Sequence, residues 1–68
     1  MYVKMNSERV QELREERGLS RRDLAGAAGI SAETVRRAER EEPVRFSTGR
    51  AVADALGAEP SRDLGRVL

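Results

Sequence analysis

Residues that begin helices and residues that end them alternate along this chain so closely that no helix can run much beyond ten residues. Small polar side chains at N-cap positions accept hydrogen bonds from free backbone N–H groups, whereas a left-handed glycine or a proline ends a helix. The expected N-caps are Asn6 or Ser7, Ser20, Ser31 and Ser47, and the expected stops are Gly18, Gly29, Pro43 and Gly57. This pattern predicts an all-α fold, a compact bundle of about five short helices over residues 7–17, 20–28, 31–41, 48–57 and 60–67.

Apolar residues at helical spacing supply the candidate core of the bundle. Val10 and Leu13 lie on one face of the first expected helix, and Val35 and Ala38 lie on one face of the third. The Phe46 side chain is expected to be buried in the core, as a core plug. Residues 1–5 leave two alternatives open, a short extended arm or a frayed terminus.

Length and composition predict one small domain over residues 1–68, with about 60% of the surface of the unfolded chain buried on folding. The chain has no cysteine and no histidine, so neither a disulfide nor a structural metal is expected to stabilise it. Packing alone, or packing against a second subunit, must do so. The preferred dimer interface is formed by the apolar residues on one side of the last expected helix, which are Leu64, Val67 and Leu68. The N-terminal arm is the second choice.

The residue types present argue against several classes of function. Without histidine, cysteine or a glycine-rich phosphate loop, the chain offers no activated nucleophile or general base, so we expect no enzyme, no cofactor and no small-molecule ligand. The longest nearly apolar stretch, Leu24–Ile30, is far shorter than the roughly 20 residues of a membrane span, and the N-terminus has no apolar signal region. A soluble, cytoplasmic protein is expected.

Charge is distributed unevenly although the formal net charge is only +1. Residues 17–40 carry a net charge of +3, whereas the segments on either side carry −1 each. Of the 13 basic residues 12 are arginine, which suits bidentate recognition of phosphate or guanine but is equally what a GC-rich genome produces. The positive charge of the chain is therefore concentrated in its middle third.

Small residues in this middle third fall where two short helices must cross closely. Ala25 leaves room for a second helix, Gly29 can turn the chain sharply, and Val35 can pack back onto Leu24 and Ala25. With these offsets the chain resembles the phage-repressor-like XRE family of helix-turn-helix proteins, from about Val10 to Gly57. The matching positions are Arg14, Gly18-Leu19-Ser20, Leu24-Ala25, Ala28-Gly29-Ile30-Ser31, Thr34-Val35, Glu39 and Ala53-Asp54-Ala55-Leu56-Gly57.

This resemblance implies a lambda-repressor-like domain whose third helix enters the major groove of DNA. Helical spacing places one set of residues on the face opposite Val35 and Ala38; the set is Ala32, Glu33, Arg36, Arg37 and Arg40. Arg36 and Arg37 are the main candidates for base edges because a guanidinium binds guanine bidentately. Glu33 can accept from cytosine, and Ala32 can make only an apolar contact. The alternative is a solvated face with Glu33–Arg36 and Glu33–Arg37 ion pairs.

The helix ends are expected to contact DNA phosphates, because backbone amides and the helix dipole favour anions there. The candidates are Ser20, Arg21, Arg22, Ser31, Thr34 and Arg40. Arg21 ranks above Arg22 because it matches a position that often contacts DNA in the family; the alternative for both is an ordinary exposed arginine. The resemblance also implies a structural ion pair between Arg14 and Glu39.

Two departures from the family pattern affect the expected DNA contacts. Relatives often carry a base-reading Gln or Asn where this chain has Ala32, and many have a glycine at the position of Glu41. Acidic Glu41 and Glu42 weaken binding if they lie near phosphates, unless the loop bends away or Arg45 compensates.

The resemblance implies a sequence-specific regulator of transcription, a repressor of prokaryotic or phage origin, that binds double-stranded DNA as a homodimer on a pseudo-palindromic operator. Two alternatives remain: an antitoxin or accessory factor whose main partner is a protein, and an excisionase-like architectural DNA binder.

Overall fold

The computed structural model describes residues 1–58 and 66–67, and within them the chain is mostly helical with a small antiparallel sheet. Its helices are α1 (Ser7–Glu16), α2 (Arg21–Ala28), α3 (Ala32–Ala38) and α4 (Phe46–Leu56). Its strands are β1 (Tyr2–Lys4), β2 (Val44–Arg45) and β3 (Arg66–Val67). No helix in this described part is long and apolar enough to cross a membrane.

Side-chain caps begin the first three helices. The Asn6 side chain accepts a hydrogen bond from the Arg9 backbone N–H at 3.2 Å, so Asn6 rather than Ser7 caps α1. Ser20 and Asp23 cap α2 reciprocally, each side chain accepting from the other residue's backbone N–H at 3.0 Å. Ser31 caps α3 by accepting from the Thr34 N–H at 3.1 Å. These local bonds satisfy backbone donors that have no partner within the helix.

Helices α2 and α3 form the helix-turn-helix predicted from the spacing of small residues. Gly29 ends α2 with φ of 71°, a left-handed conformation that a side chain with a Cβ adopts only with strain. The chain turns there and starts α3 three residues later. Leu24, Ala25 and Val35 are all buried at the crossing.

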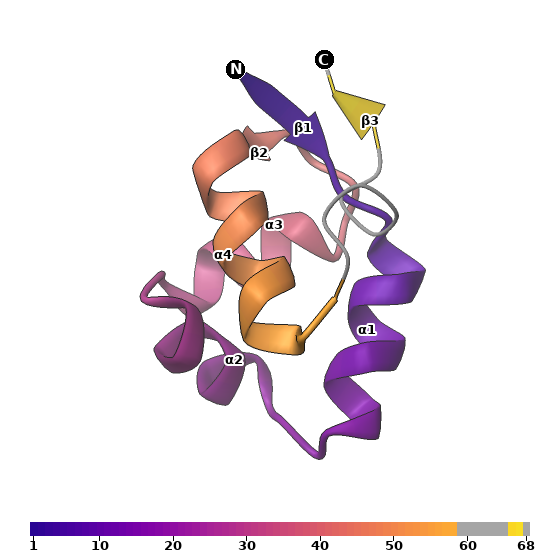
Figure 1. Cartoon of the computed structure of the whole chain (residues 1–68), viewed down its shortest axis with the longest axis vertical. Helices are drawn as coiled ribbons and strands as arrows, with labels where there is room; N and C mark the ends of the chain where they lie inside the picture. The colour runs from indigo at the N-terminus through magenta and orange to yellow at the C-terminus, as the bar shows by residue number, and fades with distance from the viewer. Residues whose placement is uncertain (59–65, 68) are drawn as a thin grey trace.

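The sheet has the order β2-β1-β3, with β1 antiparallel to both neighbours. Val3 lies opposite Val44 on one side and Val67 on the other. Figure 1 shows the sheet at one end of the molecule, beside the start of α4. Val3 and Val44 are buried, so the sheet closes that end of the core.

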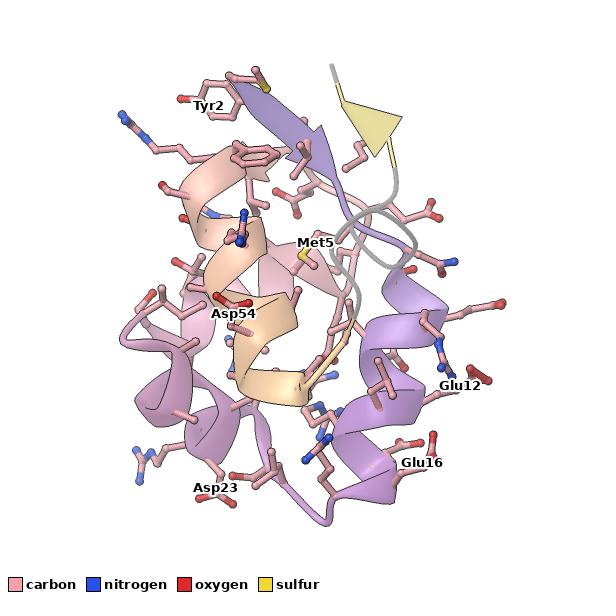
Figure 2. All side chains as sticks on the ribbon, viewed as in Figure 1. Tyr2, Met5, Glu12, Glu16, Asp23 and Asp54 are labelled. Atoms are coloured by element: carbon pink, nitrogen blue, oxygen red, sulfur yellow. The ribbon has the colours of Figure 1, made fainter. Side chains whose placement is uncertain are left out.

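The core lies between the helices and the sheet. Its largest fully buried side chains are Leu24, Leu56, Val3, Val10, Val35 and Val52. Met5 also lies inside the molecule, whereas Glu12, Glu16 and Asp23 point outward from its periphery (Figure 2). The N-terminal segment is therefore extended and contributes to the core, which settles the choice between an extended and a frayed terminus.

The expected helical fold with a helix-turn-helix is confirmed, and the described residues contain four of the five expected helices together with a small sheet. Residues 60–65 of the fifth expected helix lie outside the described part of the chain, and Arg66–Val67 form strand β3 rather than its last turn. The physical reason is that the Val67 backbone pairs with Val3 of β1.

Helix α3 ends at Ala38 rather than near Glu41. Glu41 adopts φ of 60°, and the Glu42 N–H donates to the Arg37 carbonyl at 3.1 Å. This bond closes a left-handed helix end of the kind that glycine usually makes. Glu41, at the position where many relatives carry glycine, thus adopts the left-handed backbone conformation that glycine favours.

Helix α4 begins at Phe46, so the prediction that Ser47 caps it is wrong. The Phe46 N–H donates to the Met1 carbonyl at 3.0 Å, which extends the pairing of β1 with β2 up to the first residue of the helix. Phe46 is also 36% exposed rather than a core plug. Because the sheet already closes this end of the core, the Phe46 ring stays at the surface.

Candidate nucleic-acid interface

The outer face of α3 presents the side chains proposed to read DNA. Val35 and Ala38 are buried on its inner face, whereas Glu33 and Arg36 are exposed on the outer face. Arg37 and Arg40 are exposed there as well, and Ala32 is half-buried. Because the buried side chains of α3 lie on one side, its two arginines are exposed on the opposite side, and Arg40 follows just after the helix ends.

Glu33 pairs with two of these arginines. Its carboxylate lies 3.2 Å from Arg36 Nη1 and 3.4 Å from Arg40 Nη2. Arg40 Nε also lies 3.0 Å from Glu42 Oε2. All of these side chains are about half exposed, and such pairs contribute only about 0.2–1 kcal/mol each, so a nucleic acid can displace them readily.

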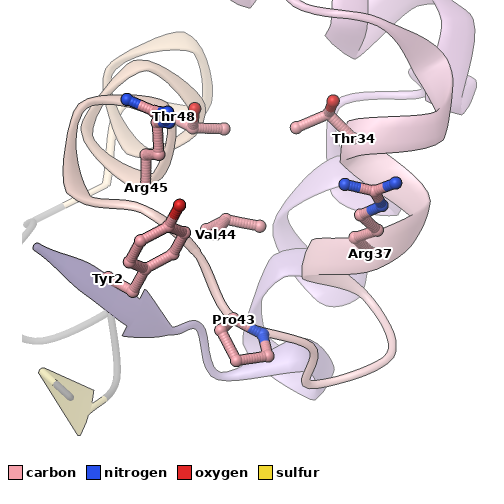
Figure 3. Close-up of a pocket in the computed structure, with 7 residues that line it drawn as sticks. All are labelled: Tyr2, Thr34, Arg37, Pro43, Val44, Arg45 and Thr48. Carbon is pink, nitrogen blue, oxygen red and sulfur yellow. The ribbon is translucent and has the colours of Figure 1, made fainter.

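Arg37 differs from its neighbours on α3. The Glu33–Arg37 pair considered as an alternative does not form, and within residues 1–58 Arg37 makes no ion pair. Together with Thr34, Arg37 forms one wall of a pocket beside α3 (Figure 3). Among the described residues, no carboxylate occupies its guanidinium group.

The start of α2 lies next to this face and carries more positive charge. Arg21 and Arg22 occupy its first two positions and are exposed. The Ser20 backbone N–H, and then its hydroxyl, hydrogen-bond with Asp23 and hold the pKa of the Asp23 carboxyl below its ordinary value of 3.8. The reciprocal hydrogen bonds between Ser20 and Asp23 therefore stay intact at neutral pH.

The N-cap of α3 places two hydroxyls together. Ser31 Oγ and Thr34 Oγ1 lie 2.9 Å apart, with Ser31 exposed and Thr34 half-buried. Either hydroxyl can donate to a phosphate oxygen when it is not donating to the other.

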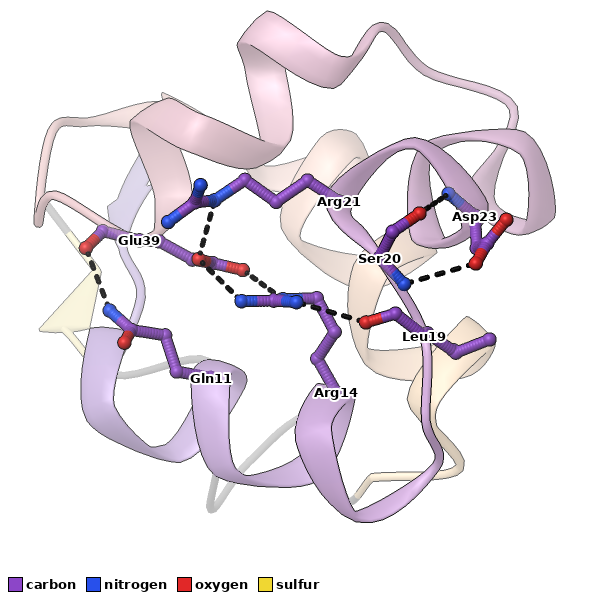
Figure 4. A network of polar contacts seen from close by, with 7 residues as sticks. All are labelled: Gln11, Arg14, Leu19, Ser20, Arg21, Asp23 and Glu39. Atoms are coloured by element: carbon purple, nitrogen blue, oxygen red, sulfur yellow. Dashed lines mark hydrogen bonds and ion pairs between the residues drawn. The ribbon is translucent and has the colours of Figure 1, made fainter.

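A buried carboxylate joins three helices behind this surface (Figure 4). Glu39 is 6% exposed, and its Oε2 lies 2.8 Å from Arg14 Nε of α1. Its Oε1 accepts from Arg14 Nη2 at 3.4 Å and from Arg21 Nε of α2 at 3.0 Å. Arg14 also donates to the Leu19 carbonyl at 2.9 Å, and Gln11 donates to the Glu39 carbonyl at 3.3 Å. The Arg14–Glu39 pair expected from the family resemblance is thus part of a larger network.

The comparison with known proteins agrees with this architecture. The profile of the helix-turn-helix family matches residues 10–62. The chain belongs to the helix-turn-helix family. The resemblance to its XRE branch found in the sequence is confirmed. The domain is also 39% identical over 56 residues to a protein of Archaeoglobus fulgidus that is inferred to be an HTH-type transcriptional regulatory protein. The aligned region spans 82% of this chain but 18% of that relative.

Arg21 has a second contact that the sequence of this helix-turn-helix domain did not reveal. It was predicted to meet DNA phosphates, yet its Nε is bound to Glu39 while 46% of its side chain remains exposed. A partly exposed guanidinium has other N–H groups directed away from Glu39. Glu39 therefore holds Arg21 in place at the edge of the α3 surface.

The residues proposed as a dimer interface stay a prediction. Leu64 and Leu68 lie outside the described residues, and the backbone of Val67 belongs to β3.

Proposed function

We propose that this domain regulates transcription by binding double-stranded DNA in a sequence-specific manner, with α3 in the major groove. The observation that carries the proposal is the outer face of α3 and the residues just after it, where Arg37 makes no ion pair within the described residues and lies between the weakly paired Arg36 and Arg40. Membership of the helix-turn-helix family supports DNA binding, and the name of the archaeal relative supports regulation of transcription.

Base reading is assigned to the outer face of α3. Arg37 is the leading candidate because a guanidinium binds guanine O6 and N7 bidentately, and it has no ion pair within the described chain to break first. Arg36 can also bind guanine once its ion pair with Glu33 is broken. Glu33, once released, can accept from cytosine, and Ala32 can contact a thymine methyl group.

Phosphate contacts are assigned to the residues around this face. Arg21 and Arg22 extend from the start of α2, and Arg40 extends from the end of α3. Hydroxyl groups supply the remaining donors, from Ser20, Ser31 and Thr34. These contacts fix the orientation of α3 without reading sequence.

A homodimer on a pseudo-palindromic operator would place two copies of α3 in successive major grooves about 34 Å apart. Leu64, Val67 and Leu68 stay the proposed interface, and repression in the cytoplasm of a prokaryotic cell is the proposed biological role.

The proposal is tested by selecting duplexes from a random library with the purified chain at near-physiological salt. Enrichment of an inverted repeat is expected. Recovery of a single half-site would support sequence reading and contradict the dimer. No enrichment would contradict the proposal and would favour the alternative that this chain is an antitoxin or accessory factor. Co-purification would then reveal its protein partner. Binding that bends DNA without a preferred sequence would favour the architectural alternative.

A further inference from the structure

A pocket of about 220 Å³ opens between α3 and residues that lie outside the helix-turn-helix (Figure 3). Thr34 and Arg37 of α3 form one wall. Arg45 and Thr48, from β2 and α4, form the opposite wall. Tyr2 of β1 lies at its base, and its hydroxyl points toward the space between the walls.

The polar groups in this pocket match an anion. Two guanidinium groups, two threonine hydroxyls and one phenol line it, and none of the described residues in its lining carries a carboxylate. Within the described chain neither Arg37 nor Arg45 makes an ion pair, so both cations are available to a ligand. Tyr2 is 48% exposed, which leaves its hydroxyl accessible.

The position of the pocket indicates which anion it meets. It shares Arg37 with the proposed base-reading face, so a ligand in it lies at the border of α3. A helix in the major groove has the phosphate backbone of DNA along its borders. The residues proposed to contact phosphates at the start of α2 do not line this pocket.

We propose that the pocket holds a phosphate group of the DNA backbone, bound by Arg45 and by the hydroxyls of Tyr2 and Thr48. This inference rests on the proposed function and adds a contact made by the N-terminal strand and the start of α4. Arg37, on the opposite wall, is drawn toward the same phosphate and is thereby held next to the base edges. The small sheet then positions a DNA contact as well as closing the core.

The test measures affinity and its salt dependence for the duplex enriched by selection and for a mixed-sequence duplex. The variants are Arg45→Gln and Tyr2→Phe, both at exposed side chains, with Arg50→Gln as the matched control. Arg50 lies on the same helix as Thr48, does not line the pocket, and is 3.9 Å from Asp54. Circular dichroism verifies that each variant is folded.

Arg45→Gln is expected to weaken binding about tenfold on both duplexes, because one charge-assisted hydrogen bond is lost. It should also reduce the slope of log affinity against log salt by about 0.9, the value for one phosphate contact. Tyr2→Phe is expected to weaken binding about threefold with no change in slope, because it removes a neutral hydrogen bond. Arg50→Gln should leave both quantities unchanged.

An Arg45→Gln variant that behaves like Arg50→Gln, while the wild type still binds its selected duplex, would overturn this inference and leave the proposed function standing. If the wild type binds no duplex, the proposed function fails and this inference fails with it. A titration with inorganic phosphate separates the sources of the phosphate group. Amide shifts around Arg45 at millimolar phosphate, with DNA binding unaffected by Arg45→Gln, would assign the pocket to a small phosphate and contradict the DNA contact.

Discussion

Replacing Arg14 by methionine should destabilise the domain far more than removing the other arginine bound to Glu39. The Arg14 side chain is 12% exposed, and the Glu39 side chain is 1% exposed. Removing one member of a buried ion pair costs about 3–5 kcal/mol, and we expect about 3 kcal/mol because Arg21 still contacts Glu39. A domain of 68 residues has a free energy of unfolding of roughly 3–10 kcal/mol, so this loss is a large part of the total.

Arg21→Gln is the matched comparison, because it removes a partner of the same carboxylate from a side chain that is 46% exposed. Its loss should be about 0.2–1 kcal/mol, as for exposed ion pairs. The double variant Arg14→Met with Glu39→Met should regain much of the stability that Arg14→Met loses, since no uncompensated buried charge remains.

Urea denaturation followed by circular dichroism measures all three free energies. Equal losses for Arg14→Met and Arg21→Gln would refute the argument that burial decides the strength of each contact. A double variant no more stable than Arg14→Met would show that lost packing, rather than the unpaired carboxylate, causes the destabilisation.

Three further predictions follow from single residues. Glu41→Gly should raise the free energy of unfolding by about 0.5–1 kcal/mol, because glycine relieves the left-handed strain at φ of 60° while losing some of the gain to backbone entropy. Arg37→Ala should lose about 1–3 kcal/mol of binding on the selected duplex and relax base preference, whereas Arg21→Ala should weaken binding to all sequences and reduce the salt slope by about one. The pKa of Asp23 is lowered in the folded state, so its contribution to stability is complete above the ordinary value of 3.8 and is lost as pH falls through the lower folded-state pKa. The stability of Asp23→Asn should therefore fall less with acid than that of the wild type.

Each of these has a distinct contrary result. A lower urea midpoint for Glu41→Gly than for the wild type would show that the left-handed backbone at Glu41 is not strained. Equal effects of Arg37→Ala and Arg21→Ala on a mixed-sequence duplex would contradict their separate roles. Parallel loss of stability with acid in Asp23→Asn and the wild type would show that the Asp23 carboxylate adds nothing to the cap.

Local signals made the helix-turn-helix predictable from sequence. The caps at Ser20 and Ser31 and the turn at Gly29 act within a few residues, so their spacing specifies α2 and α3 directly. Periodicity alone also placed the arginines of α3 on one outer face. The family resemblance supplied the Arg14–Glu39 pair, which joins residues 25 positions apart.

The sheet and its consequences were not predictable by the same means. Strands of two or three residues carry no readable alternation, and β1 is defined by partners that lie 41–43 and 62–64 positions away in sequence. That pairing moves the start of α4 to Phe46 and places Tyr2 beside Arg45. The Arg21–Glu39 contact depends on how α2 crosses α3, which spacing along one helix does not determine.

The central claim is that the outer face of α3 contacts DNA, and amide chemical-shift mapping with the selected duplex tests it most directly. The account predicts the largest changes along residues 32–40 and at the first turn of α2, and little change on the outer surface of α1 around Glu12 and Glu16. Changes centred on α1, with those of α3 unaltered, would contradict it.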